Sequence, residues 1–378
     1  MGLRRGPRAC AAVVVLALVG LAATAASASA LPARFWGVVP QAAASSEQLA
    51  RLHRGGVGSI RVAFDWTSLQ SQRGATIDWS GVDSMVEKAT ANGIAILPFL
   101  TGAPAWAVPQ GTVRGSGGAK APARLPIASA AAAGWREFVQ QAVLRYGSTG
   151  SFWVAHPTLP ALPIRTWQIW NEPNFKYFVA KPNPTEYGKL VKASNAAIKS
   201  VDPGAKVVLA GLFGRPKGSR TKSGKHKSLN WYAKDFLEAM YKANPGIKSS
   251  FAGVALHPYT PRYQELPEEI EEIRNLLKDE KDSGKGLWIT ELGWSSEPPD
   301  PAIDQFAKGL AGQARELRGA FGLLRNKAAN WKLKQVYWFS VDDVDGACNF
   351  CGGAGLFGAG FKPKKAWFEY VKFAGGTP

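Results

Sequence analysis

The feature that most constrains the fold of this chain is a regular alternation of short apolar segments with segments of helical periodicity. Most of the apolar segments are continuously apolar and rich in Val, Ile, Leu and aromatic residues. This pattern is typical of parallel strands whose outer face is covered by helices. The predicted strands are eight in number and comprise residues 35–39, 59–66, 94–100, 164–170, 206–212, 253–257, 287–290 and 335–340.

Between these strands, apolar residues recur at the spacing of a helix face, most clearly over residues 135–143, 187–191 and 270–277. Start and stop signals agree with this assignment, since Ser46 precedes the first helix, Asn183-Pro184 the fourth, and Gly284 follows the sixth. Eight strand–helix pairs predict a single (β/α)8 barrel, a TIM barrel, over residues 31–378. The alternative is a doubly wound open sheet, which normally carries a glycine-rich phosphate loop after its first strand. The sequence has no such loop.

The carboxyl ends of barrel strands face the active site, so residues at which an apolar strand turns polar are candidates for function. Glu172 follows the fourth strand, and Glu291 ends the seventh. Two carboxylates on opposite sides of one barrel mouth are what glycoside hydrolysis needs, and a separation of about 5 Å is expected of a retaining enzyme. Other polar or aromatic residues at strand ends are Arg61 and Asp65, His257 and Tyr259, and Trp338, Asp342 and Asp343.

Residues 170–173, WNEP, together with residues 290–294, TELGW, resemble the paired signature of the (β/α)8 retaining glycoside hydrolases, which include cellulase-like and xylosidase-like families. The resemblance implies that Glu172 is the acid/base, Glu291 the nucleophile, and Asn171 a hydrogen-bond partner of the sugar 2-hydroxyl. It also implies that Arg61 orients the nucleophile, and that Tyr259 and His257 contact the carboxylates. It further implies that Trp338 forms the floor of a sugar subsite.

The surroundings of the two glutamates support these roles independently. Apolar neighbours such as Trp167 and Trp170 are expected to raise the pKa of Glu172 by desolvation, so that it stays protonated near neutral pH. Arg61 is expected to keep Glu291 ionised and nucleophilic.

Structural explanations stay open for each candidate. A glutamate at a strand end can cap a helix, Arg61 can form a salt bridge inside the barrel, and Trp338 can be a core residue. His257 and Tyr259 suit any polar barrel rim. Trp106, in the loop after the third strand, suits either a sugar platform or loop packing. Asp342, Asp343, Asp345 and Cys348 are interpreted as turn residues or substrate contacts, and no metal site is predicted.

The N-terminal 30 residues have the features of a secretory signal peptide. Arg4, Arg5 and Arg8 precede an apolar run over residues 10–23, and Ala28-Ser29-Ala30 suits cleavage. No later apolar run reaches the roughly 18 residues of a membrane-spanning helix. We therefore expect a secreted protein without a transmembrane segment. Its remaining cysteines, Cys348 and Cys351, form either a disulfide or two free thiols.

The chain is strongly basic, with a formal net charge of +18, and loss of the three arginines of residues 1–30 would leave +15. Residues 214–228 contain six Lys or Arg and no acidic residue. This segment fits either a solvated loop or a clamp for an anionic polymer. Residues 101–126 present a similar choice, between a plain loop and a wall of the cleft. Nucleic acid is not an expected partner, because no nucleic-acid-binding motif is present.

The sequence therefore predicts a secreted, monomeric retaining β-glycosidase that uses no cofactor and acts on a neutral or anionic carbohydrate. Two other functions remain open. One is a transglycosylase of the same fold, and the other is a non-catalytic carbohydrate-binding barrel at the cell surface. Buried carboxylates without a chemical role are costly, which argues against the non-catalytic protein.

Overall fold

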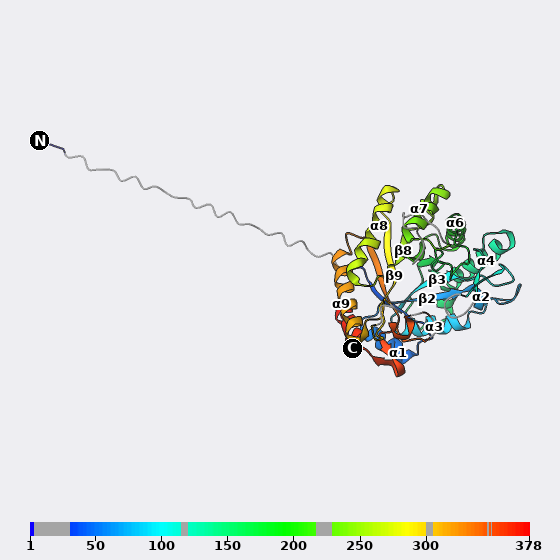
Figure 1. Ribbon diagram of the computed structural model, residues 1–378, viewed down its shortest axis with the longest axis horizontal. Helices are drawn as coiled ribbons and strands as arrows, with labels where there is room; N and C mark the ends of the chain where they lie inside the picture. The colour runs from blue at the N-terminus through cyan, green and yellow to red at the C-terminus, as the bar shows by residue number, and fades with distance from the viewer. Residues whose placement is uncertain (4–30, 115–119, 217–228, 300–304, 346–347, 349) are drawn as a thin grey trace. The chain divides into compact units, whose positions relative to one another are not determined.

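A closed barrel of parallel strands forms the centre of residues 31–378 (Figure 1). The computed structural model describes residues 1–3, 31–114, 120–216, 229–299, 305–345, 348 and 350–378. The predicted signal peptide lies almost wholly outside the described residues. In the part of the chain that is described, no helix is both long and apolar enough to cross a membrane.

The barrel strands follow one another around the barrel in chain order, and the last pairs with the first. Each predicted strand corresponds to one barrel strand, so the predicted (β/α)8 architecture is confirmed. The strands are β1 (Trp36–Val39), β2 (Ser59–Asp65), β3 (Ala95–Thr101), β6 (Thr166–Ile169), β7 (Lys206–Phe213), β8 (Gly253–His257), β9 (Gly286–Leu292) and β10 (Leu333–Phe339).

A long helix follows each barrel strand, and the helices surround the strands (Figure 1). They are α1 (Ser46–Arg54), α3 (Ser80–Ala91), α4 (Ser129–Tyr146), α6 (Pro184–Val201), α7 (Ala233–Ala243), α8 (Leu266–Asp279), α9 (Gly309–Lys327) and α11 (Lys365–Ala374). Shorter helices are α2 (Trp66–Leu69), α5 (Ser151–Ala155) and α10 (Cys351–Ala354). Two small antiparallel pairs lie in loops: β4 (Gln110–Arg114) with β5 (Lys120–Pro122), and β11 (Phe357–Gly358) with β12 (Lys362–Pro363).

Side-chain caps explain where two of the helices begin. Ser45 and Gln48 form a reciprocal capping box at the start of α1, so the capping residue is one position before the predicted Ser46. Asn183 caps α6 as predicted, because its side chain accepts from the amides of Thr185 and Glu186, with Pro184 in the first turn. These caps fix the points at which the chain enters the outer helices α1 and α6.

The main core lies between the strands and the helices, and large aromatic side chains fill much of it. Trp36 of β1 stacks on Phe321 of α9, with ring centroids 4.2 Å apart. A second, smaller apolar cluster fills the barrel interior and includes Leu97, Val208 and Tyr337. The main core and the barrel-interior cluster together hold in place the carboxyl ends of the strands, where the predicted polar residues lie.

Candidate active site

Glu172 lies in an unusual backbone turn directly after β6. Trp170 and Glu172 both have positive φ angles, 72° and 40°, which non-glycine residues rarely adopt. The Trp170 amide donates to the carbonyl of Leu100 at 2.8 Å, and the Glu172 amide donates to the carbonyl of Gly211 at 3.1 Å. Neighbouring strands therefore hold a strained turn that presents the Glu172 carboxyl group, as is common at functional sites.

The Asn174 side chain links this turn to β7 by hydrogen bonds. It accepts from the Phe213 amide at 3.0 Å and donates to the carbonyls of Phe213 and Trp231, each at 2.8 Å. The side chain is fully buried, so these bonds are made away from water. Asn174 therefore positions the Glu172 turn, a role that the sequence analysis did not assign.

Glu291 is the last but one residue of β9, and two donors hold its carboxylate. Arg61 Nη1 donates to Oε1 at 2.6 Å, and the Tyr259 hydroxyl donates to Oε2 at 2.9 Å. Arg61 is completely buried, and Glu291 is 9% exposed. The carboxylate is thus fixed in orientation and keeps only a small exposed area.

Arg61 also organises the residues beside Glu172. Its Nη2 donates to Asn171 Oδ1 at 2.6 Å, and its Nε donates to Gln168 Oε1 at 2.7 Å. The guanidinium carbon lies 4.1 Å from the ring centroid of Phe99. Arg61 thereby connects Glu291 with Asn171, the residue next to Glu172.

His257 bridges the two glutamates from β8. Its Nδ1 lies 2.6 Å from Glu172 Oε1 and 3.5 Å from Glu291 Oε2. Its Nε2 lies 2.9 Å from the hydroxyl oxygen of Thr290. Among the predicted site residues, the structure therefore brings together Arg61, Asn171, Glu172, His257, Tyr259 and Glu291.

Burial and charge give the two glutamates different protonation states. Burial raises the pKa of Glu172 well above its usual value, the charge of Glu291 raises it further, and Arg61 opposes the shift. Burial also raises the pKa of Glu291, but Arg61 and the hydrogen bond from Tyr259 act in the opposite direction. The pKa is raised for both residues and further for Glu172, so the pair holds its first proton on Glu172.

Burial, followed by the charge of Arg61, lowers the pKa of His257 well below its usual value. The imidazole is therefore neutral beside the two carboxyl groups, and each of its nitrogens can take only one hydrogen-bonding role.

Within the described residues, ligand atoms of Glu172, His257 and Glu291 lie within 4.8 Å of one another, close enough to share a metal ion. These atoms are already engaged in hydrogen bonds with each other or with Arg61 and Tyr259. The adjacent buried guanidinium would also repel a cation. The donor set fits a proton-transfer site better than a metal site.

Trp338 does not reach this site, so the prediction that it floors a sugar subsite is wrong. Its side chain is fully buried and packs near Trp294 and Phe321, while its Nε1 donates to the carbonyl of Ala354 at 3.1 Å. Successive strand residues point to opposite faces. The inward-facing aromatic residue at this end of β10 is therefore the next one, Phe339, which packs in the barrel-interior cluster.

Aromatic rings surround Tyr259, the tyrosine that donates to Glu291. The ring centroids of Phe350, Phe213, Phe306 and Phe339 lie 5.2, 5.8, 6.2 and 6.4 Å from that of Tyr259. These phenylalanines carry no sequence signal of a site, because all four lie in loops or at a strand end without a recognisable motif. Aromatic rings of this kind are the usual apolar contacts of bound ligands.

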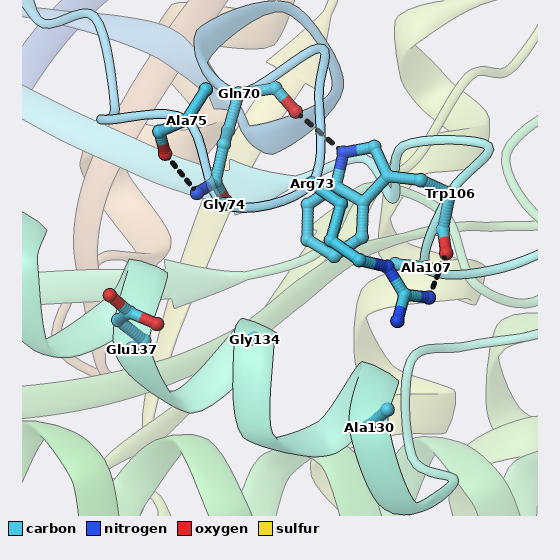
Figure 2. Close-up of a pocket in the computed structure, with 9 residues that line it drawn as sticks. All are labelled: Gln70, Arg73, Gly74, Ala75, Trp106, Ala107, Ala130, Gly134 and Glu137. Atoms are coloured by element: carbon cyan, nitrogen blue, oxygen red, sulfur yellow. Dashed lines mark hydrogen bonds between the residues drawn. The ribbon is translucent and has the colours of Figure 1, made fainter.

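Trp106 lies in a separate pocket beside α4 (Figure 2). Its Nε1 donates to the carbonyl of Gln70 at 2.9 Å, and Arg73 lies over its ring, 5.7 Å from the centroid. Trp66 meets the ring edge-on with centroids 5.2 Å apart. These contacts hold Trp106 against the segment after β2, and its predicted role as a sugar platform stays a prediction.

Two of the remaining acidic candidates, Asp65 and Asp343, have structural roles. The Asp65 side chain caps α2 by accepting from the Thr67 amide at 2.9 Å. Asp343 Oδ1 accepts from Lys364 Nζ at 2.6 Å and from the Gly355 amide at 2.9 Å. Of the two states left open for the cysteines, the structure has the Cys348–Cys351 disulfide.

Comparison with known proteins agrees with this geometry. Residues 163–322 match the family model described as the glycosyl hydrolase catalytic core. The chain is 30% identical over 230 residues to a beta-xylosidase of Geobacillus stearothermophilus, an alignment that covers 56% of this chain and 41% of the relative. The chain thus spans about two fifths of the length of this curated relative. The match confirms the resemblance to glycoside hydrolases that the residue motifs indicate.

Solved structures share the fold. A monomeric beta-xylosidase from Caulobacter crescentus CB15 superposes with a TM-score of 0.63 at 19% identity, over 90% of this chain and 68% of that chain. A family 39 glycoside hydrolase from Bacteroides cellulosilyticus WH2 gives the same score and identity, over 91% and 64%. At this level of identity, the similarity establishes the (β/α)8 fold.

Proposed function

We propose that this chain is a secreted retaining β-glycosidase in which Glu172 is the acid/base and Glu291 the nucleophile. One observation carries the proposal: carboxyl oxygens of the two residues lie within 4.8 Å of each other at the mouth of the barrel. Retaining glycosidases place their carboxyl groups about 5 Å apart, whereas inverting enzymes need about 6.5–9.5 Å to admit a water molecule.

In the first step, the ionised Glu291 attacks the anomeric carbon, and Glu172 gives its proton to the departing glycosidic oxygen. Arg61 and Tyr259 hold the attacking carboxylate in place, which reduces the entropy lost on reaching the transition state. Formation of the glycosyl–enzyme bond removes the negative charge of Glu291.

In the second step, Glu172 acts as a base. The charge of Glu291 is one cause of the high pKa of Glu172, so the loss of that charge lowers the pKa. The Glu172 carboxylate can then take a proton from water as the water attacks the anomeric carbon. The same pair of glutamates thereby serves both steps.

The substrate is proposed to be a β-glycoside or polysaccharide. The curated relative is a beta-xylosidase, so a β-xyloside is the first compound to test. The phenylalanines around Tyr259 would supply apolar contacts to the sugar faces.

Two variants with different substrate profiles test the proposal. Glu291→Gln is expected to abolish turnover of every substrate, because no covalent intermediate can form. Glu172→Gln is expected to lose roughly 10²–10⁴-fold on alkyl glycosides, yet to keep much of its first-step rate on aryl glycosides whose phenol leaves unprotonated. The anomer first released by the unaltered enzyme, followed by NMR, should have the configuration of the substrate. Equal losses on both substrate types, or release of the opposite anomer, would contradict the proposal.

A further inference from the structure

A buried line of hydrogen-bonded side chains joins Arg61 to Glu172 through the barrel interior. Arg61 Nε lies 2.7 Å from Gln168 Oε1, and Gln168 Nε2 lies 3.4 Å from Thr290 Oγ1. Thr290 Oγ1 lies 2.9 Å from His257 Nε2, and His257 Nδ1 lies 2.6 Å from Glu172 Oε1. Arg61, Gln168, Thr290 and His257 are all 0% exposed, so water does not compete for these bonds.

The direction of the hydrogen bonds follows from Arg61. A guanidinium only donates, so the oxygen of the Gln168 amide must face it. The Gln168 amide nitrogen then points to the carbonyl of Leu209, at 3.1 Å, and to Thr290 Oγ1. An amide nitrogen also only donates, so the Thr290 oxygen accepts from Gln168 and keeps its own hydrogen for His257 Nε2.

The neutral ring of His257 has one donor and one acceptor nitrogen. Because Nε2 accepts from Thr290, the hydrogen of the ring is on Nδ1, which donates to Glu172 Oε1. In the opposite tautomer, Thr290 would accept from both neighbours. Its hydroxyl hydrogen would then have no acceptor among the hydrogen bonds of the described residues, which is unfavourable at a buried position.

Gly211 of β7 leaves the space in which Thr290 and His257 meet. A Cβ atom at this position would lie 1.9 Å from His257 Nε2 and 2.5 Å from Thr290 Oγ1, closer than side chains approach one another. The carbonyl of the same glycine holds the Glu172 amide. The absence of a side chain at Gly211 therefore allows Thr290 and His257 to come within hydrogen-bond distance of each other.

We propose that Gln168 and Thr290 are positioning residues that fix the Nδ1–H tautomer of His257, so that Glu172 Oε1 accepts a hydrogen bond and Oε2 carries the catalytic proton. In the opposite tautomer, Nδ1 would accept the proton of Glu172 and draw it away from the leaving group. The effect on catalysis rests on the proposed function, but the tautomer itself does not.

The first test reads the tautomer directly, by NMR of protein labelled with ¹⁵N at histidine and recorded above pH 8, where exposed imidazoles are neutral. The chain has four histidines, and His257→Asn identifies the signal of His257. His156 provides a reference in the same spectrum, because its Nδ1 faces the carbonyl of Phe152 at 2.8 Å and can only donate. We expect the Nδ1–H form for His257, and an Nε2–H form would overturn the proposal whether or not a substrate has been found.

Two variants should change that tautomer. In Gln168→Glu, the new carboxylate accepts the Thr290 hydroxyl hydrogen, so Thr290 accepts from His257 instead and the ring switches to Nε2–H. Thr290→Val removes the donor to Nε2 and should populate the same form, whereas Thr290→Ser keeps the hydroxyl and should keep Nδ1–H. Unchanged tautomers in both Gln168→Glu and Thr290→Val would overturn the proposal.

Kinetics then test the role in catalysis. Thr290→Val should lower kcat/KM for an alkyl β-glycoside by about tenfold or more, a fraction of the roughly 10²–10⁴-fold that general acid catalysis supplies. An aryl glycoside with an acidic phenol should change by no more than about twofold, and Thr290→Ser should restore the alkyl glycoside rate. Equal losses on both substrates would show a purely structural role. Inactivity of the unaltered enzyme on every glycoside would instead contradict the proposed function, and would leave the tautomer result intact.

Discussion

Arg61 makes three of the hydrogen bonds that hold the candidate active site together. Its three nitrogens donate to Gln168, Asn171 and Glu291, and the planar fork of the guanidinium makes this possible from one fixed position. Lysine would keep the charge but could not reach three acceptors in one plane. The acceptors left without a donor would be buried, where each costs about 1–3 kcal/mol.

Arg61→Lys should therefore lower both activity and stability. We expect kcat/KM to fall by about a hundredfold or more, because the nucleophile and Asn171 lose their common support. We also expect a lower melting temperature, measured by calorimetry or circular dichroism. The matched control is Arg73→Lys, which changes an exposed arginine beside Trp106. Similar, small effects of both changes would contradict this account of Arg61.

Tyr259→Phe should shift the acidic limb of the pH profile. The hydrogen bond from Tyr259 lowers the pKa of Glu291, so its removal raises that pKa. The nucleophile must be ionised, and the acidic limb of kcat/KM should therefore move to higher pH in the variant. The basic limb, assigned to deprotonation of Glu172, should move less. A profile recorded from pH 3 to 9 on one alkyl glycoside, which needs the proton of Glu172, measures both limbs, and an unmoved acidic limb would count against Glu291 as the nucleophile.

The sequence identified the residues with a proposed chemical role better than the residues that position them. Glu172, Glu291 and their partners could be found because polar residues ending apolar strands stand out. Gln168 and Thr290 could not, because each lies inside an apolar strand and acts through a neighbour in space. Trp338 was misassigned because residues one apart in a strand point to opposite faces, and the apolar run does not reveal which face is inward.

At the scale of single elements, α8 carries a buried glutamate outside the catalytic site. Glu269 is 5% exposed, its Oε2 has no hydrogen-bond partner among the described residues, and that oxygen packs against Gly214, where a Cβ would lie 1.8 Å away. Burial raises its pKa from 4.5 to about 8, the charge of Arg215 opposes this, and nearby glutamates add to it. Between pH 4.5 and 8 the folded chain thus holds a proton that the unfolded chain releases.

Glu269 should therefore destabilise the fold as the pH rises through this range. Stability falls with pH where the folded state binds more protons, and the loss above pH 8 is at most about 5 kcal/mol at 1.36 kcal/mol per pKa unit. Glu269→Gln should have a higher melting temperature than the unaltered chain at pH 9 and a similar one at pH 4. As a control, Glu271→Gln alters an exposed residue of the same helix and should show no such difference.

The elements differ in how far the sequence predicts them. Strands were predictable because buried parallel strands are continuously apolar, and α6 because Asn183-Pro184 marks its start. The β4–β5 hairpin was not, because Gly- and Pro-rich residues between β3 and α4 show neither strand nor helix periodicity. The cap of α1 was assigned one residue late because Ser45 and Ser46 are chemically equivalent choices in sequence.

At the scale of the whole molecule, the closed barrel explains why residues far apart in sequence could be placed together. Strand order around the barrel follows chain order, so Glu172 after β6 and Glu291 in β9 lie three strands apart across one mouth. That reasoning needs only the count and order of strands. The loops that decide substrate specificity have no comparable rule, and they are where the sequence is least informative.

The described residues that border the basic segment, residues 214–228, lie beside the candidate active site. The Gly214 amide donates to the carbonyl of His257 at 3.0 Å, and the Trp231 amide donates to that of Asn174 at 2.9 Å. Arg215 pairs with Glu268 and Glu272 of α8. The other five cations, Lys217, Arg220, Lys222, Lys225 and Lys227, lie outside the described residues.

If these five cations attract an anionic glycan, replacing them all with Ser should raise KM for that substrate and leave kcat nearly unchanged, because they contribute binding that is equal in ground and transition states. Salt should weaken the same attraction, as the Debye length falls from about 10 Å at 0.1 M to about 3 Å at 1 M. A neutral oligosaccharide should respond to neither change. A control with the same loss of charge replaces five exposed lysines near strand starts and helix ends, at the opposite end of the barrel. They are Lys206, Lys242, Lys278, Lys332 and Lys334. This control should leave both KM values unaltered. If the control raises KM for the anionic glycan equally, net charge attracts the substrate, and the segment at the mouth has no special role.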